Sequence, residues 1–213
     1  EETTLDAVDA ALQAGSCSTI ITYGQTGSGK TYTVLGVVAS NPLVGDDVVV
    51  PATGLFLRVL RDIPAYRDAR RTATHVVVCL NVVEIYLDSV RDLLGAGGNL
   101  KLLIDTDAVK IPELTFRKID TLRDATAAYA QADSKRVSRA TNMNDTSSRS
   151  HAMFSIDVFQ QERTDANPEP LKLEDMLAVK DKKKKGSVNL PNAFGAGQPP
   201  VMHSTICLTD LAA

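Results

Sequence analysis

The chain has 213 residues, of which 44% are hydrophobic and 23% are charged, and its formal net charge is −3. This is the composition of an ordinary globular protein, with one domain as the default, and the acidic balance argues against a protein that coats nucleic acid. No stretch approaches the roughly 20 apolar residues of a membrane span, and residues 1–15 lack the order of a signal peptide, so we expect a cytosolic protein with no membrane or nucleic-acid partner.

The first half of the chain alternates helical and strand-like patterns. The spacing of Leu5, Val8 and Leu12 predicts a helix at the N-terminus. Residues 17–23 are rich in Ile and Thr and predict a short buried strand. The elements predicted after it are a helix from about 29 to 38, a loop at 40–48, a helix from 52 to about 66, a strand at 74–86 and a helical segment at 88–94.

A small hairpin and a helix are predicted next. Short alternating segments at 100–104 and 108–116 favour the hairpin. Thr121 is the expected N-cap of a helix from about 122 to 133, because its hydroxyl can accept a hydrogen bond from a free N-terminal amide.

The last part of the chain holds two predicted strands separated by a long segment. Alternation over 152–159 predicts a strand with one solvated face. From 161 to 200 the composition turns to Pro, Asn, Gly and Lys, which predicts an insertion loop with one helical turn at 173–179. A strand is predicted again at 202–208.

Three cysteines, an odd and sparse set, are typical of a reduced intracellular protein. Each of Cys17, Cys79 and Cys207 lies beside β-branched or aliphatic residues. We therefore expect small core residues rather than redox or metal-binding groups.

A glycine-rich segment joins the first predicted strand to the helix that follows it. Residues 24–31 match the pattern G-x-x-x-x-G-K-[S/T] in the strand-to-helix context that this motif requires. Glycines let the backbone wrap closely around a phosphate. Lys30 is expected to reach the β- and γ-phosphates, and Thr31 to offer its hydroxyl to Mg²⁺. The residues expected to surround the nucleotide phosphates are Gly24, Gln25, Thr26, Gly27, Ser28 and Gly29.

A second polar segment, residues 144–151 (NDTSSRSH), lies between a predicted helix and a predicted strand. Hydroxyls, an amide and a guanidinium in one loop are the groups that a γ-phosphate sensor needs. On composition alone, a serine-rich surface turn explains the same residues equally well.

The two segments, in this order, resemble the P-loop and switch I of kinesins. Residues 23–33 (YGQTGSGKTYT) and 144–151 carry this resemblance, and 83–94 (VEIYLDSVRDLL) is similar to the strand and turn after the family's second helix. The likeness covers most of residues 1–161 and resumes at about 202, so that only the insertion lies outside it.

The resemblance implies ATP and Mg²⁺ as ligands and microtubules, built from tubulin, as the partner. It assigns Asn144, Ser147, Ser148 and Arg149 to the catalytic group. Ser147 and Ser148 are expected to close over the γ-phosphate and Arg149 to latch the closed state, and Ser148 is expected to be a ligand of Mg²⁺ as well.

Residues 206–212 (ICLTDLA) are similar to the strand that enters switch II of kinesins. Asp210 stands in the place of the acidic residue that holds Mg²⁺ through water. The residue pattern agrees, because an aspartate that ends a β-branched strand beside a P-loop is in the position of a Walker-B carboxylate. Tyr32 has the place of a ring near the adenine, and a core aromatic residue is an equally good interpretation.

The sequence also departs from the family. Kinesins follow the aspartate with Leu-Ala-Gly, whereas this chain has Ala213 in the place of that glycine, which predicts weakened γ-phosphate sensing. The first strand of the family, its relay helix and the last elements that touch the microtubule are missing from residues 1–213. We interpret the chain as an incomplete motor domain from a longer protein that dimerises through a stalk.

Two functions of different classes remain open. The first is an ATP-dependent microtubule motor of the cytoplasm and cytoskeleton. The alternative is a structural kinesin-like component of microtubules or of the axoneme of a cilium or flagellum, with weak or no ATPase activity. The lysine run at 182–185 allows a tether to acidic tubulin tails, although a solvated loop is the commoner explanation. Another P-loop enzyme is disfavoured, because neither Asn-Lys-x-Asp nor Leu-Ser-Gly-Gly-Gln occurs.

Alternating strands and helices around a P-loop predict an α/β fold. We expect a three-layer P-loop NTPase domain of the kinesin type, incomplete, with a mixed central sheet and the nucleotide at the C-terminal ends of the strands.

Overall fold

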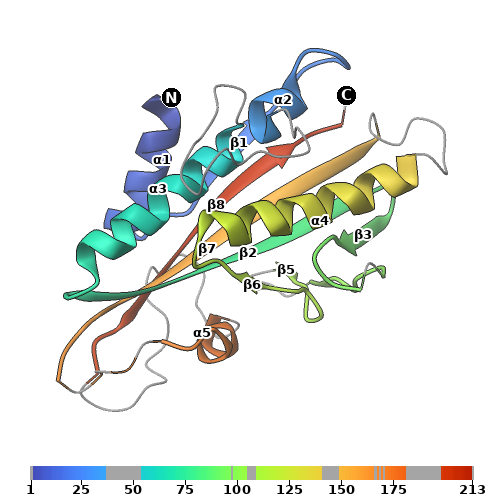
Figure 1. Cartoon of the computed structure of the whole chain (residues 1–213). Coiled ribbons are helices and arrows are strands. Elements are labelled where there is room, and N and C mark those ends of the chain that lie inside the picture. The colour runs from blue at the N-terminus through green and yellow to red at the C-terminus, as the bar shows by residue number, and fades with distance from the viewer. Residues whose placement is uncertain are drawn as a thin grey trace.

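A mixed β-sheet is the framework of the protein, as the computed structural model shows (Figure 1). The structure describes residues 2–36, 54–96, 98–104, 109–140, 149–165, 167, 169, 171–180 and 198–212. Within them the strands follow the order β1-β8-β7-β2-β3, β6 pairs with β2, and β4 and β5 form a separate hairpin. The strands are β1 (Ser18–Thr22), β2 (Thr74–Tyr86), β3 (Ser89–Asp92), β4 (Leu103–Ile104), β5 (Val109–Lys110), β6 (Arg117–Lys118), β7 (Ser150–Glu162) and β8 (Val201–Asp210).

The directions of the strands decide which strand ends meet. β1 is parallel to β8, with Thr22 opposite Asp210. β7 is antiparallel to β8, so that Ala152 near its start also lies opposite Asp210. The end of β1, the end of β8 and the start of β7 therefore share one end of the sheet.

Helices lie on both faces of the sheet (Figure 1). The helices are α1 (Glu2–Ala14), α2 (Lys30–Leu35), α3 (Leu55–Arg70), α4 (Leu122–Ala140) and α5 (Leu173–Lys180). The first four pack on one face and contribute to the larger hydrophobic core, whereas α5 packs on the other. None of the helices in the described part of the chain is long and apolar enough to cross a membrane.

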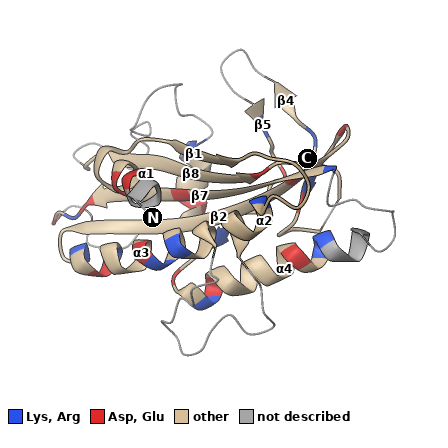
Figure 2. Ribbon diagram, turned by 90° about the horizontal axis from the view of Figure 1, so that it is seen from above, with Lys and Arg blue, Asp and Glu red and all other residues tan. Residues whose placement is uncertain are grey.

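Aromatic rings join the sheet to α3 and α4 in the larger core. The ring centroid of Phe154 in β7 lies 5.0 Å from that of Phe56 in α3 and 6.2 Å from that of Tyr129 in α4. The opposite face has a smaller core, where Met176 of α5 is fully buried beside Val77 of β2. Charged residues of both signs lie along α3 and α4 (Figure 2).

Most predicted elements are confirmed. α1 buries Val8 and Leu12, as the spacing predicted. β2 has the predicted bounds, α4 begins after Thr121, and the hairpin appears as β4 and β5. Several elements are longer than predicted, among them α4, which continues to Ala140, and α3, which continues to Arg70 through Pro64.

Other expectations were wrong. Strand 17–23 is not buried on both faces, because β1 has an outer position among the described strands and Ile21 is 58% exposed. Cys17 is exposed as well, whereas Cys79 and Cys207 are buried as expected. β7 has no solvated face over most of its length, because it lies between β8 and β2 in the middle of the sheet.

Residues 88–94 do not form the predicted helical segment. Ser89–Asp92 instead form β3, which pairs with the end of β2 across a two-residue turn. The Asp92 carboxylate then accepts hydrogen bonds from the backbone N–H of Leu94, at 2.8 Å, and of Thr115, at 2.9 Å. Pairing with a long strand outweighs the local helical pattern here.

The turn between β2 and β3 contains a strained residue. Leu87 has φ of 51° although it is not a glycine, and its side chain is 72% exposed. Two-residue hairpin loops require such positive φ values, and asparagine tolerates them better than leucine does. We predict that Leu87→Asn raises the free energy of unfolding by about 1 kcal/mol in urea denaturation, because the left-handed conformation costs a β-carbon residue about 1–2 kcal/mol. Leu87→Ala keeps the strain and should give no such gain; equal stabilisation by both changes would contradict the explanation.

Gly54 holds the beginning of α3 against the end of α2. A β-carbon at this position would lie 2.3 Å from the carbonyl carbon of Leu35 and 2.5 Å from the carbonyl oxygen of Val34. We predict that Gly54→Ala lowers the free energy of unfolding by about 1–3 kcal/mol, because the two backbones must separate. Gly98→Ala is the matched control, since a β-carbon there meets nothing within 4 Å. Similar midpoints of denaturation for the two variants would show that the α2–α3 contact tolerates a side chain.

Candidate functional site

The glycine-rich segment 24–31 connects the end of β1 to α2 (Figure 1). α2 begins at Lys30, and Gly29 is its N-cap with φ of 89°. Gly24 has φ of 152°, and a β-carbon added there would lie 2.5 Å from the hydroxyl oxygen of Ser28. Residues other than glycine rarely adopt these φ values, so the shape of the loop depends on both glycines.

Lys30 folds back over this loop. Its Nζ donates hydrogen bonds to the carbonyl oxygens of Gly24, at 2.6 Å, and of Gln25, at 3.0 Å. The ammonium group therefore lies against the first two residues of the segment. Phosphate oxygens bound in the loop would compete with these carbonyl oxygens for its three N–H groups.

Asp210, the last residue of β8, lies beside the start of α2. The Thr31 hydroxyl donates a hydrogen bond of 2.8 Å to Oδ2 of Asp210, and a guanidinium nitrogen of Arg136 lies 3.6 Å from the same oxygen. Asp210 is only 3% exposed. The parallel pairing of β1 with β8 thus brings the loop and the carboxylate together, although 179 positions separate Thr31 from Asp210 in the chain.

The other carboxylate oxygen of Asp210 bears on metal binding. Oδ1 is buried and has no hydrogen-bond partner among the described residues. A buried acceptor without a partner is unfavourable, so a cation or a cation-bound water would satisfy it. Hydroxyl and carboxylate oxygens are also the ligands that Mg²⁺ prefers. The oxygens of Thr31 and Asp210 therefore fit this metal.

Arg136 was missed by the sequence analysis. Its side chain is 13% exposed and pairs with the buried Asp210. A signal was present: Ala125, Tyr129 and Ala132 form a buried stripe along α4, and Arg136 continues the stripe at the next helical turn. A charge on the buried side of a helix indicates a buried partner.

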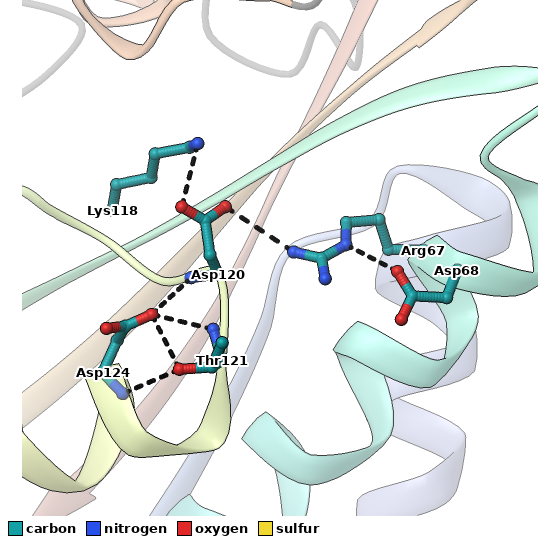
Figure 3. A network of polar contacts seen from close by, with 6 residues as sticks. All are labelled: Arg67, Asp68, Lys118, Asp120, Thr121 and Asp124. Atoms are coloured by element: carbon teal, nitrogen blue, oxygen red, sulfur yellow. Dashed lines mark hydrogen bonds and ion pairs between the residues drawn. The ribbon is translucent and has the colours of Figure 1, made fainter.

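A polar network fixes the beginning of α4, the helix that carries Arg136 (Figure 3). The Asp124 carboxylate accepts hydrogen bonds from the backbone N–H and the hydroxyl of Thr121, at 2.8 and 2.9 Å. The Thr121 hydroxyl oxygen in turn accepts a hydrogen bond of 3.2 Å from the backbone N–H of Asp124. Burial alone would raise the pKa of Asp124, but these hydrogen bonds hold it below its usual value. Asp120 adds ion pairs with Lys118 and with Arg67 of α3. This is the capping-box arrangement, and it confirms the predicted N-cap.

The predicted switch I residues are described only in part. Asn144, Ser147 and Ser148 lie outside the described residues, as do Ala213 and the lysine run 182–185. Arg149 is exposed and immediately precedes β7, at the end of the sheet that also holds Asp210.

The start of β7 also contacts the segment after β8. The backbone N–H of Ala212 donates a hydrogen bond of 2.9 Å to Nδ1 of His151. The two predicted switch segments are thus connected directly at His151, which the sequence did not single out as a linking residue.

Tyr32 lies in the first turn of α2 and is 56% exposed. The interpretation of Tyr32 as a core aromatic residue is therefore wrong. Its ring remains accessible to a ligand beside the loop.

Comparison with known proteins defines the class. The family model of the kinesin motor domain matches residues 1–213. A kinesin-like protein KIF18B of Mus musculus is 31% identical over 182 residues, which cover 84% of this chain and 20% of the relative. The kinesin heavy chain of Drosophila melanogaster is 34% identical over 151 residues, or 70% of this chain and 14% of the relative. The chain therefore belongs to the kinesin motor domain family, and it spans a fifth or less of the length of these relatives.

A solved structure supports the same fold. The structure of a fast kinesin superposes with a TM-score of 0.72 at 24% sequence identity, covering 98% of this chain and 48% of that one. The predicted α/β fold of the P-loop NTPase type, with a mixed sheet flanked by helices, is thus confirmed.

The pair of Arg136 and Asp210 gives a test of the site without any ligand. We predict that Arg136→Met lowers the free energy of unfolding by about 3 kcal/mol, because it leaves a buried carboxylate without its countercharge. The double variant Arg136→Met with Asp210→Asn should recover most of the lost free energy of unfolding, because the uncompensated charge is gone. Urea denaturation of the two single variants and of the double variant measures this recovery. Effects that add within about 0.5 kcal/mol would show that the two side chains are not coupled.

Proposed function

We propose that this chain is the nucleotide-binding part of an ATP-hydrolysing microtubule motor. The observation that carries the proposal is the hydrogen bond of Thr31 to the buried carboxylate of Asp210, at the end of a glycine-dependent loop against which the ammonium group of Lys30 lies. Membership of the kinesin motor domain family supports it, since that family is generally an ATPase family.

Lys30 would exchange its carbonyl contacts for the β- and γ-phosphates of ATP, and the amides of residues 24–29 would surround those phosphates. Thr31 and Asp210, with Ser148 as a further ligand, would hold Mg²⁺, which neutralises the charge that develops on the phosphates. The exposed ring of Tyr32 is available to pack near the adenine.

Hydrolysis would proceed by attack of water on the γ-phosphorus, with cleavage of the bond to ADP. Asn144, Ser147 and Ser148 would position this water and close over the phosphate, and Arg149 would hold the closed state. The hydrogen bond between Ala212 and His151 supports a coupling of both switch segments, since movement of one strand end would disturb the other. Loss of the γ-phosphate would release both switch segments.

Microtubules are the proposed partner and the cytoskeleton the proposed location, because the matched relatives are kinesins. Residues 1–213 would be part of a motor domain in a longer, dimeric protein. The segment 161–200, which contains α5, would be an insertion within it.

A second candidate rests on Ala213, which stands where kinesins have the glycine after the switch II aspartate. It is a structural kinesin-like component of microtubules or axonemes with weak or no ATPase activity. Phosphate release measured with and without microtubules separates the two: stimulation supports the motor, and an unchanged rate supports the structural role.

The proposed role of Lys30 is tested by Lys30→Ala in the full-length protein. We expect ATP hydrolysis to fall about 100-fold or more, because the variant loses a positive charge at the transferring phosphate. Lys172→Ala removes an equal charge from an exposed position away from the loop and should leave the rate unchanged. Hydrolysis by Lys30→Ala at the rate of this control would contradict the assignment of the nucleotide site.

A further inference from the structure

His151 connects the two strand ends at which the predicted switch segments meet the sheet. It is the second residue of β7, and its Nδ1 accepts the hydrogen bond of 2.9 Å from the backbone N–H of Ala212. Ala212 follows Asp210, the last residue of β8, by two positions. The bond therefore joins a residue within a strand to a segment that has already left the sheet.

The ladder between β7 and β8 ends just before this contact. Its last pair is Ala152 with Asp210. β7 itself goes on pairing with β2 through His151, which lies opposite Ile85. The sheet thus holds the backbone of His151 at the place where the backbone of Ala212 leaves it. A side-chain acceptor satisfies the amide of Ala212 where the ladder no longer does.

The donor decides the form of the imidazole ring. A backbone N–H can only donate, so Nδ1 of His151 carries the acceptor lone pair and the ring proton lies on Nε2. The ring is half-buried, which shields it in part from water that would compete for the amide. In this contact the His151 ring is therefore a neutral acceptor, a role that a side chain without an acceptor atom cannot fill.

We propose that His151 is a positioning residue for ATP hydrolysis, an inference that rests on the function proposed above. Asp210 lies two residues before Ala212, and Arg149 lies two residues before His151. The hydrogen bond thus keeps the carboxylate proposed to hold Mg²⁺ in a fixed relation to the segment that carries Arg149. The ring has no contact with ATP in this scheme and acts through the backbone that it holds.

The first test measures the hydrogen bond without any nucleotide. Amide hydrogen exchange of the peptide that contains Ala212 is followed by mass spectrometry in the full-length protein and in two variants. His151→Asn keeps an acceptor, because Oδ1 of asparagine is as many bonds from Cα as Nδ1 of histidine, whereas His151→Leu has a methyl group there. We expect exchange of the Ala212 amide to rise about threefold to tenfold in His151→Leu only, which corresponds to the loss of one hydrogen bond. Equal exchange in the two variants would overturn the role of the ring as the acceptor.

The second test measures positioning during hydrolysis. We expect His151→Leu to lower kcat about tenfold and to change the KM for ATP less than about twofold, because the ring orients groups without contacting ATP. His151→Asn should restore most of the rate. Circular dichroism equal to that of the unchanged protein shows that a slow variant is folded. Hydrolysis by His151→Leu at the unchanged rate, or by His151→Asn as slowly as by His151→Leu, would overturn the inference.

Failure of the proposed function has a different signature. An unchanged full-length protein that hydrolyses no ATP, with or without microtubules, would overturn the motor and with it the role of His151 in hydrolysis, even where exchange at Ala212 still responds to His151→Leu. An active unchanged protein together with an equally active His151→Leu variant would overturn only the role of His151.

Discussion

The parallel pairing of β1 with β8 is the constraint on which the site depends. It sets Thr22 opposite Asp210, so that the loop after β1 and the carboxylate at the end of β8 emerge side by side. The hydrogen bond between Thr31 and Asp210 is a consequence of this register. A shift of one residue would turn the Asp210 side chain to the other face of the sheet and leave Thr31 without it.

The buried negative charge of the Asp210 carboxylate needs a positive charge nearby, and α4 supplies it. Arg136 reaches Asp210 from the end of the buried stripe that Ala125, Tyr129 and Ala132 form along α4. The capping network at Thr121 and Asp124 fixes the other end of α4. The electrostatics of the candidate site therefore depend on a helix that contains none of the residues predicted for it.

The sequence alone predicted those elements whose residue pattern is local. The P-loop pattern at 24–31, the valine-rich β2 and the cap at Thr121 follow from short-range patterns, and the structure has each element at the predicted place. The predictions that were wrong concerned residues whose structure depends on neighbours in space. Residues 89–92 form β3 because β2 is available for pairing, and β1 is partly exposed because of its position in the sheet. The pairing of Arg136 with Asp210 joins positions 74 apart, and a single sequence contains no measure of such proximity.

The close approach at Gly54 has a consequence for motion. The backbone at the start of α3 lies against the end of α2 with no side chain between them, and α2 carries Lys30 and Thr31. A ligand that displaced α2 would therefore press directly on the first turn of α3, a helix of 16 residues. At the other end of α3 the Tyr66 hydroxyl donates a hydrogen bond to the carbonyl oxygen of Leu12, so α3 connects the neighbourhood of the glycine-rich loop with α1.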